Sequence, residues 1–314
     1  VFGPNTAMAS SLIQAVDKLT VARICSGQVV VELSTAVKEL VENSIDSGAT
    51  KVEVKLRDHG TTCIEVTDNG CGISPENYTG LTAKYHTSKL SSFDDLQSVT
   101  SFGFRGEAVS SLCELSGNFV VVTRVAGQTQ ATKLTYSRTG KLLSQEAAAH
   151  PVGTTVSVSE IFKPLPVRRQ ELVRNVKKKH YPKMLKVLQA YAVVATNVRL
   201  SCSNTVAQGK DSRTSGSSRQ QQVLCTQGQG RMSDNIANVF GAKFLGTLVP
   251  FSLVVGVGTE GGEIDGDAED QGPPSSSEAA STAEGARIEP SSSSLPSSPA
   301  SPEPKREVVG WVSK

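Results

Sequence analysis

A helix-forming stretch at residues 34–46 carries the polar side chains with the clearest chemical potential. At about 100° per residue, Glu39, Asn43 and Asp46 fall within roughly 60° of one another. The opposite face is apolar and holds Val37, Leu40, Val41 and Ile45. The Glu39 carboxylate could take a proton from water, and the Asn43 carboxamide one turn later could ligate a hard cation. The pattern also fits an ordinary solvated helix face, so alone it leaves both interpretations open.

A second candidate element is the sequence DNGCGI, which directly follows the strand-like run IEVT. Asp68 stands at the end of that run, and Gly70 and Gly72 follow it. Glycines let the backbone turn sharply and approach a ligand closely, and a buried Asp could accept a hydrogen bond from an exocyclic amine. An ordinary turn has the same D-x-G-x-G pattern. It is not the dinucleotide fingerprint, because the position that needs a third glycine is Pro75.

The third element combines the segment YHTSKL, at 85–90, with the glycine-rich turn TSFGFRGEAV, at 100–109. Gly103 and Gly106 bracket two residues of the turn, and a helix is predicted to begin at Glu107. Unpaired N–H groups and the positive end of the helix dipole make such a helix start suitable for phosphate, although an ordinary glycine-punctuated loop is the alternative. A fourth element, GTTV at 153–156, could place a hydroxyl near a bound base.

The elements around these motifs predict an α+β fold. Helices are predicted at 9–25, 34–47, 177–196 and 233–240, and strands at 51–57, 62–67, 118–125, 131–137, 154–159, 198–203, 221–225 and 307–313. The first two strands form a hairpin across 58–60. Strands paired mainly as hairpins imply a mixed, mainly antiparallel sheet with helices on one face.

Charge and composition divide the 314 residues further. The net charge of +2 conceals a stretch at 258–306 that is rich in Ser, Pro and Gly and carries −7, so the remainder carries +9. Such a stretch cannot bury enough apolar surface to order itself and is predicted to be a disordered insertion. We therefore expect one domain at 1–197, and an incomplete second domain at 198–257 and 307–314.

Several classes of protein are excluded or disfavoured. The six cysteines are scattered without C-x-x-C pairs, which argues against a disulfide framework and a structural zinc site and favours reduced thiols inside the cell. No apolar run approaches the roughly 18–20 residues that span a bilayer, so we expect no membrane partner.

A basic stretch at 163–186 carries +8 of the excess charge. It could neutralise several phosphates of a nucleic acid without reading its sequence, or it could be a solvated basic helix start. The residues singled out as DNA contacts are Arg168, Arg169, Lys177, Lys178 and Lys179.

Taken together, the four elements resemble the Bergerat signature shared by gyrase B, Hsp90, histidine kinases and MutL. Within this GHKL superfamily, KELVENSIDSGAT, DNGCGI, HTSK and FGFRGEA resemble the MutL family of DNA mismatch repair proteins. ICSGQVV, LPVRRQ and YPKMLKVLQAY resemble its eukaryotic PMS branch. The resemblance covers nearly everything outside the insertion and implies a Bergerat-type ATPase domain, followed by a truncated second α/β domain of ribosomal-S5-like type.

The resemblance also implies roles for single residues and names ATP and Mg²⁺ as cofactors. Glu39 would be the general base, Asn43 the magnesium ligand and Asp68 the group that recognises adenine. The full set of implied cofactor contacts is Asn43, Asp46, Asp68, Gly70, Gly72, Thr87, Ser88, Lys89, Gly103, Phe104, Arg105, Gly106, Glu107, Ala108, Val109 and Thr155.

Two functions follow from the resemblance and the basic stretch. The first is a slow, magnesium-dependent ATPase whose nucleotide closes two such domains into a clamp. Slow turnover is expected because the second-domain lysine that reaches the γ-phosphate in this family is absent here. The second is an ATP-switched DNA-binding module with negligible hydrolysis. The implied partners are another MutL homologue in a heterodimer, MutS homologues and DNA, and the implied location is the nucleus.

Overall fold

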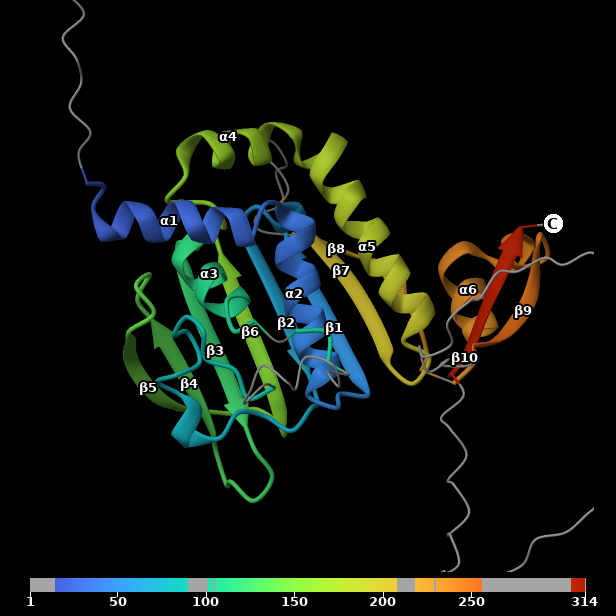
Figure 1. Cartoon of the computed structure of the whole chain (residues 1–314), viewed down its shortest axis with the longest axis horizontal. Coiled ribbons are helices and arrows are strands. Elements are labelled where there is room, and N and C mark those ends of the chain that lie inside the picture. Colours follow the sequence, from blue (N-terminus) through green and yellow to red (C-terminus); the bar gives the residue numbers. More distant parts are fainter. Residues whose placement is uncertain are drawn as a thin grey trace, which may run out of the picture. The chain divides into compact units, whose positions relative to one another are not determined.

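An eight-stranded sheet organises most of the chain (Figure 1), with strand order β5-β4-β3-β6-β2-β1-β7-β8. The computed structural model describes residues 15–89, 101–103, 105–207, 218–228, 230–255 and 306–313. The strands of the sheet are β1 (Lys51–Arg57), β2 (Cys63–Asp68), β3 (Asn118–Arg124), β4 (Ala131–Tyr136), β5 (Leu142–Ala148), β6 (Gly153–Ser159), β7 (Arg199–Ala207) and β8 (Ser218–Cys225). All neighbours are antiparallel except β1 and β7, which run parallel. The predicted mixed, mainly antiparallel sheet is confirmed.

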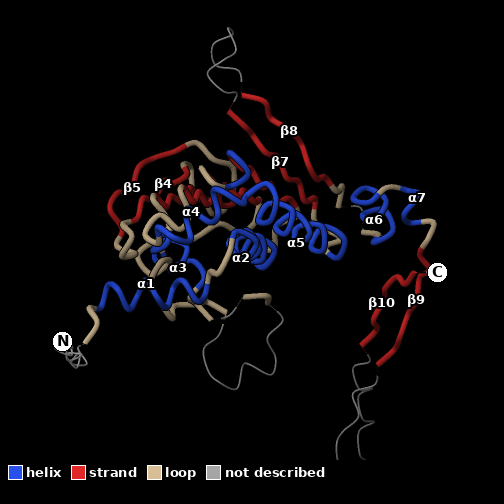
Figure 2. Tube along the Cα trace, turned by 90° about the horizontal axis from the view of Figure 1, so that it is seen from above, coloured by secondary structure: helices blue, strands red, loops and turns tan. Residues whose placement is uncertain are grey.

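Helices gather on one face of this sheet, and Figure 2 shows α1, α2, α3 and α5 on the same side. The helices are α1 (Lys18–Val29), α2 (Leu33–Asp46), α3 (Ala108–Leu115), α4 (Pro166–Asn175), α5 (Tyr181–Val194), α6 (Met232–Phe240) and α7 (Ala242–Leu245). Short helical turns occur at η1 (Asp58–Gly60), η2 (Pro75–Asn77) and η4 (Val176–His180), the last of which has π-helical geometry.

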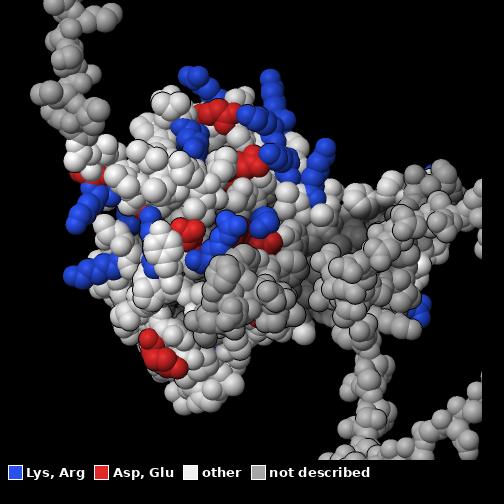
Figure 3. Space-filling model, in the orientation of Figure 1, with Lys and Arg blue, Asp and Glu red and all other residues white. Residues whose placement is uncertain are grey.

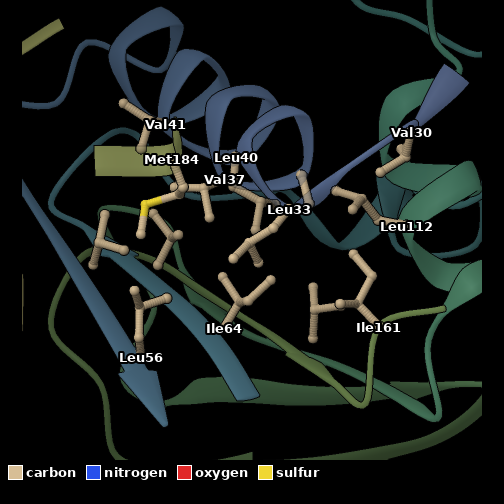
Figure 4. Packing of buried hydrophobic residues seen from close by; sticks show 14 of the residues in the cluster. Val30, Leu33, Val37, Leu40, Val41, Leu56, Ile64, Leu112, Ile161 and Met184 are labelled. Carbon is tan, nitrogen blue, oxygen red and sulfur yellow. The ribbon is translucent and has the colours of Figure 1, made fainter. Parts of the chain in front are cut away.

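The core lies between the helices and the sheet (Figure 4). Alternation places Val52, Val54 and Leu56 of β1 on the buried face, where each is at most 1% exposed. The apolar stripe of α2 packs onto this face together with residues of α3 and α5. The residues that Figure 4 labels are Val30, Leu33, Val37, Leu40, Val41, Leu56, Ile64, Leu112, Ile161 and Met184. The opposite edge of α2 carries Glu39, Asn43 and Asp46, which are not among the buried residues of the helix and form its polar edge.

Three local features differ from the expectation. Helix α1 begins at Lys18, where Asp17 caps it by accepting a hydrogen bond from the Thr20 N–H at 2.9 Å, and residues 9–14 of the predicted helix lie outside the described residues. Strand β5 was not predicted, because its sequence LLSQEAA does not alternate and its side chains are mostly solvent-facing. Helix α4 was not predicted either, because its sequence is strongly polar.

The strands at 198–203 and 221–225, which we expected in a second domain, extend the first sheet instead. Strand β7 pairs along the whole length of β1, and β8 forms a hairpin with β7. The reason is that a strand pattern shows alternation but not which sheet accepts the strand. The expected boundary at residue 197 therefore does not separate two sheets.

The chain divides by its contacts into two units, Val1–Gly246 and Thr247–Lys314. The second unit contains an antiparallel pair formed by β9 (Leu248–Val255) and β10 (Arg306–Ser313). The predicted insertion at 258–306 lies outside the described residues except Arg306, and the S5-like character of a second domain stays a prediction. Among the described residues, no helix is long and apolar enough to span a membrane.

Candidate functional site

The polar edge of α2 faces solvent beside a lysine that is shared by two carboxylates. The Nζ of Lys38 lies 3.1 Å from Oε1 of Glu39 and 2.7 Å from Oε2 of Glu42. Glu39 keeps 23% of its side chain exposed, whereas Glu42 is buried and also accepts a hydrogen bond from the hydroxyl of Tyr191. Burial opposes the charge on Lys38, but its bonds to Glu42 and Glu39 outweigh this and raise its pKa. Glu39 is thus held in place and remains reachable by water.

Asn43 and Asp46 lie one and two turns beyond Glu39. Together they bind the side-chain ammonium group of Lys89. The ammonium of Lys89 lies 3.1 Å from Oδ1 of Asn43 and 2.5 Å from Oδ2 of Asp46. Asp46 also accepts hydrogen bonds from the backbone N–H groups of Phe102 at 3.0 Å and Gly103 at 3.1 Å. The side chain of Asp46 is only 6% exposed. A carboxamide and a carboxylate oxygen are ligands that suit Mg²⁺, and Lys89 shows that a positive charge fits between them.

Asp68 ends β2 on the helix-covered face and is 8% exposed. It accepts three hydrogen bonds, from the Gly70 N–H at 2.9 Å, the Ser44 hydroxyl at 3.0 Å and the Thr154 N–H at 3.2 Å. Burial raises the pKa of Asp68 above its ordinary value, and these hydrogen bonds offset the rise only in part. A buried carboxylate at a strand end can accept a hydrogen bond from an amine of a ligand.

The glycines after Asp68 are required by the packing of the loop itself. A Cβ on Gly70 would lie 1.9 Å from Oγ of Ser47, at the end of α2. Gly72 has φ +77°, and a Cβ there would lie 2.3 Å from the carbonyl oxygen of Arg124 on β3. The loop can therefore lie directly against α2 and β3 only with glycine at both positions.

The segment 85–89 and the turn at 101–107 lie side by side at the start of α3. The Tyr85 N–H donates to the Gly106 carbonyl at 3.0 Å, and a Cβ on Gly106 would lie 2.6 Å from the carbonyl oxygen of His86. Thr87 accepts a hydrogen bond from the Lys89 N–H at 3.1 Å. Ser88 is exposed.

Helix α3 begins beside this contact. Glu107 is its N-cap residue, and Ala108 and Val109 form its first turn, whose N–H groups have no partner within a helix. Arg105 is exposed, and Phe104 lies outside the described residues. A Cβ on Gly103 would lie 3.6 Å from Oδ1 of Asn43, so the turn reaches the polar edge of α2. The structure thus brings together the two motifs that are far apart in the sequence.

One predicted contact must be corrected from Thr155 to Thr154. Asp68 pairs with Thr154 across β2 and β6, whereas Thr155 pairs with Thr67. The hydroxyl of Thr155 lies 2.8 Å from that of Thr67, on the opposite face of the sheet from the Asp68 side chain. Thr154 is buried beside Asp68, with its hydroxyl 3.1 Å from that of Thr123. Strand alternation places the two threonines on opposite faces of the sheet. Only the register of β6 against β2 tells which of them shares a face with Asp68.

Sequence reasoning also missed three supporting residues. Ser44, Lys38 and Tyr191 hold Asp68, Glu39 and Glu42 respectively. The ring of Tyr191 also makes an edge-on contact with Phe102, with centroids 5.8 Å apart, which ties the glycine-rich turn to α5. Ser44 had a detectable signal, because it occupies the apolar face of α2, whereas Tyr191 comes from a distant element.

The basic stretch separates into structural arginines and exposed lysines. Nη1 of Arg168 donates to the carbonyls of Gly27 at 2.7 Å and Val30 at 3.3 Å. Nη1 of Arg169 donates to the carbonyls of Thr61 at 2.7 Å and Ile161 at 3.2 Å, and burial lowers its pKa. Both guanidinium groups thus bind the backbone of neighbouring segments, and the DNA contacts predicted for these two arginines stay a prediction.

Lys177, Lys178 and Lys179, by contrast, are exposed on η4. Lys179 pairs with Glu171 at 3.0 Å, while Lys177 and Lys178 have no ion-pair partner among the described residues. Figure 3 shows Lys and Arg side chains gathered over α4 and the start of α5.

Comparisons with known proteins agree with the motifs. Residues 31–161 match the family described as histidine kinase-, DNA gyrase B- and HSP90-like ATPases. The chain is 49% identical over 239 residues to the human mismatch repair endonuclease PMS2, a match that covers 76% of this chain and 26% of that protein. It is 48% identical over 250 residues to the Arabidopsis thaliana DNA mismatch repair protein PMS1, covering 80% of this chain and 26% of that protein.

A solved structure has a similar fold. The crystal structure of the N-terminal domain of a DNA repair protein superposes with a TM-score of 0.64 at 38% identity and covers 74% of this chain and 64% of that chain. The chain spans about a quarter of the length of the curated relatives that it matches.

Proposed function

Since the chain belongs to the MutL family of mismatch repair proteins, whose ATPase domain is of the GHKL type, we propose that it binds ATP with Mg²⁺ and hydrolyses the nucleotide slowly. The observation that carries this proposal is the convergence on α2. Asn43 and Asp46 hold a cation beside the backbone of the glycine-rich turn, and Glu39 lies one turn away on the same helix edge.

In the proposed reaction, each residue of the site has one task. Asp68 accepts a hydrogen bond from the exocyclic amine of adenine, and the first turn of α3 donates N–H groups to the phosphates. Glu39 takes the proton of the water that attacks the γ-phosphate. When bound, Mg²⁺ would be held by Asn43, close to Asp46, and would neutralise charge on the phosphates.

Lys89 must leave Asn43 and Asp46 when the nucleotide site is loaded, because the same oxygens would serve the metal. Its ammonium can then pair with a phosphate, since the side chain starts from the segment that lies against the glycine-rich turn. Lys89 therefore neutralises the polar edge of α2 when no nucleotide is bound. When nucleotide is bound, Lys89 contacts a phosphate instead.

The adenine end of the site gives a test with a built-in control. Replacing Thr154 with valine keeps the shape of the side chain but removes a hydroxyl next to Asp68. We expect the dissociation constant for ATP to rise by about 10-fold, which is the effect of losing one hydrogen bond between the Thr154 hydroxyl and the adenine end of the ligand. Thr155→Val should change it less than about 2-fold, because Thr155 faces away from Asp68. Isothermal titration of both variants measures this, and an equal loss in both would place adenine elsewhere.

A second candidate function is sequence-independent DNA binding by the exposed lysines of η4. The observation in its favour is that Lys177 and Lys178 are exposed, form no ion pair with any described residue, and lie on a surface where basic side chains gather. Such a surface binds the phosphate backbone with strong salt dependence and no base readout. This function is compatible with the ATPase, because the lysines lie outside the residues proposed for the nucleotide.

Reversing the charge of Lys177, Lys178 and Lys179 to glutamate should lower the affinity for duplex DNA at low salt by at least about 10-fold. It should also flatten the plot of log affinity against log salt, whose slope is about −0.9 per neutralised phosphate. Reversing Lys51, Lys133 and Lys141 provides a control of equal charge. If both triple variants lose affinity equally, the binding depends on net charge and not on η4.

The wider role that we propose follows the names of the relatives. The ATP-bound domain would close as a clamp with another MutL homologue, and would act in the nucleus with MutS homologues on mismatched DNA. Support for this part comes from the identity to mismatch repair proteins of humans and plants.

A further inference from the structure

A pocket of about 600 Å³ lies at the ends of β3, β4 and β5, beside the segment that connects β5 to β6. Its lining includes Arg124, Gln130, the three consecutive alanines 147–149 and His150, and it includes no Asp or Glu. The volume falls within the range of pockets that hold small molecules. The proposed nucleotide site does not use any of these side chains.

Arg124 faces this pocket from the opposite side of the sheet to Asp68. The preceding residue, Thr123, is fully buried on the helix-covered face, where its hydroxyl contacts that of Thr154. Side chains alternate along a strand, so the Arg124 side chain lies on the other face. The carbonyl of Arg124, in contrast, is packed against Gly72. The pocket is therefore separate from the Asp68 side chain.

One nitrogen of the Arg124 guanidinium has no hydrogen-bond partner. This atom, Nε, is buried, and the side chain forms no ion pair with any residue that the structure describes. A planar fork of N–H donors fits the two oxygens of a carboxylate or phosphate group.

His150 is fixed at the edge of the pocket. Its Nδ1 lies 2.8 Å from the carbonyl oxygen of Pro151, and its Nε2 lies 2.8 Å from the hydroxyl of Thr155. Since a carbonyl can only accept, Nδ1 donates to Pro151. The segment 149–151, which lines the pocket, is thereby anchored to β6, and the alanine side chains of the lining are small.

We propose that this pocket binds a small organic molecule through a phosphate or carboxylate group held by Arg124. The proposal does not depend on the ATPase proposal, because it uses another face of the sheet and other side chains. A bound anion would pair with the Arg124 guanidinium, which forms no ion pair among the residues that the structure describes, and the remainder of the ligand would lie against the alanines.

The test compares thermal unfolding of the chain in chloride, phosphate and citrate buffers of equal ionic strength, for the unchanged chain, Arg124→Met and Lys133→Met. Lys133 is a control because it pairs with Glu146, at 3.1 Å, outside the pocket. At about ten times the dissociation constant of the anion, we expect a rise in melting temperature of about 4 °C in the unchanged chain and in Lys133→Met. Arg124→Met should lose this rise. A rise with phosphate but not citrate would identify a phosphate ligand, and the reverse would identify a carboxylate.

Arg124→Met has a second expected property that a structural arginine would not show. Removing an arginine that forms no ion pair with any described residue should leave the melting temperature in chloride unchanged or raise it. A fall in chloride would assign Arg124 a structural role and overturn the proposal. An anion-dependent rise that persists in Arg124→Met would also overturn it, because the anion would then bind elsewhere. The NMR signal of the Arg124 Nε–H, identified by its absence in Arg124→Met, should shift on adding anion.

Discussion

Replacing Glu39 with alanine is expected to lower the rate of ATP hydrolysis by about 10²–10⁴-fold while ATP continues to bind. The expected size is that of removing a positioned general base from a proton-transfer step. Glu39 is suited to this step because Lys38 holds its carboxylate at the edge of α2 and 23% of the side chain remains exposed to water. Turnover under saturating ATP measures the rate, and equilibrium titration measures the binding.

The control for this variant is Glu53→Ala, which removes a carboxylate of similar exposure from the uncovered face of β1. Glu53 is 33% exposed and pairs with Lys55 at 3.4 Å. Its loss should leave both turnover and ATP affinity within about 2-fold, the size of effect that a solvated ion pair has. If Glu39→Ala retains turnover within the same limit, another group must activate the water. If it loses ATP binding as well, Glu39 acts in assembling the site.

Replacing Asp68 with asparagine is expected to raise the dissociation constant for ATP by about 10- to 100-fold, the range for losing a hydrogen bond to a charged group. The change should not weaken the fold. Asparagine can still accept from the N–H groups of Gly70 and Thr154, and it removes a charge that burial disfavours. Asp234→Asn, in the first turn of α6, is the control for a carboxylate outside the site.

The pKa of Asp68 adds a pH signature to this prediction. Burial raises the pKa of Asp68 in the folded chain, so the folded state binds the proton more tightly than the unfolded state does. Stability contributed by this group therefore falls as the pH rises from the ordinary Asp pKa of 3.8 to the raised value, and stays low above it. Denaturation at a series of pH values should show this fall in the unchanged chain and not in Asp68→Asn. An identical pH profile would contradict the assigned burial.

The sequence predicted those parts of the fold whose signal is local. Strand β1 has the predicted bounds because KVEVKLR alternates cleanly, and the polar edge of α2 follows from helical spacing. Strand β5 and helix α4 were not predicted, because an edge strand and a polar helix have little hydrophobic periodicity. The pairing of β7 with β1 joins residues almost 150 positions apart, and no local pattern encodes it.

In the candidate site, too, local spacing predicted some residues and not others. Glu39, Asn43 and Asp46 share a face by helix geometry, which the spacing reveals. The choice between Thr154 and Thr155 depends on the register of β6 against β2, which only the assembled sheet determines. In the sequence, Arg168 and Arg169 had the same standing as the lysines beside them, but in the structure they donate to the backbone carbonyls of Gly27 and Thr61. Net charge along a sequence does not distinguish these uses of arginine.

The central claim, that ATP bridges Asp68 and the polar edge of α2, is tested most directly by a structure of the chain with a non-hydrolysable ATP analogue and Mg²⁺. We expect the adenine amine to lie within hydrogen-bonding distance of Asp68, Mg²⁺ to contact Asn43, and the phosphates to lie at the start of α3. Lys89 should have left Asn43 and Asp46. A nucleotide bound elsewhere, or one bound here while Lys89 still occupies Asn43 and Asp46, would contradict it.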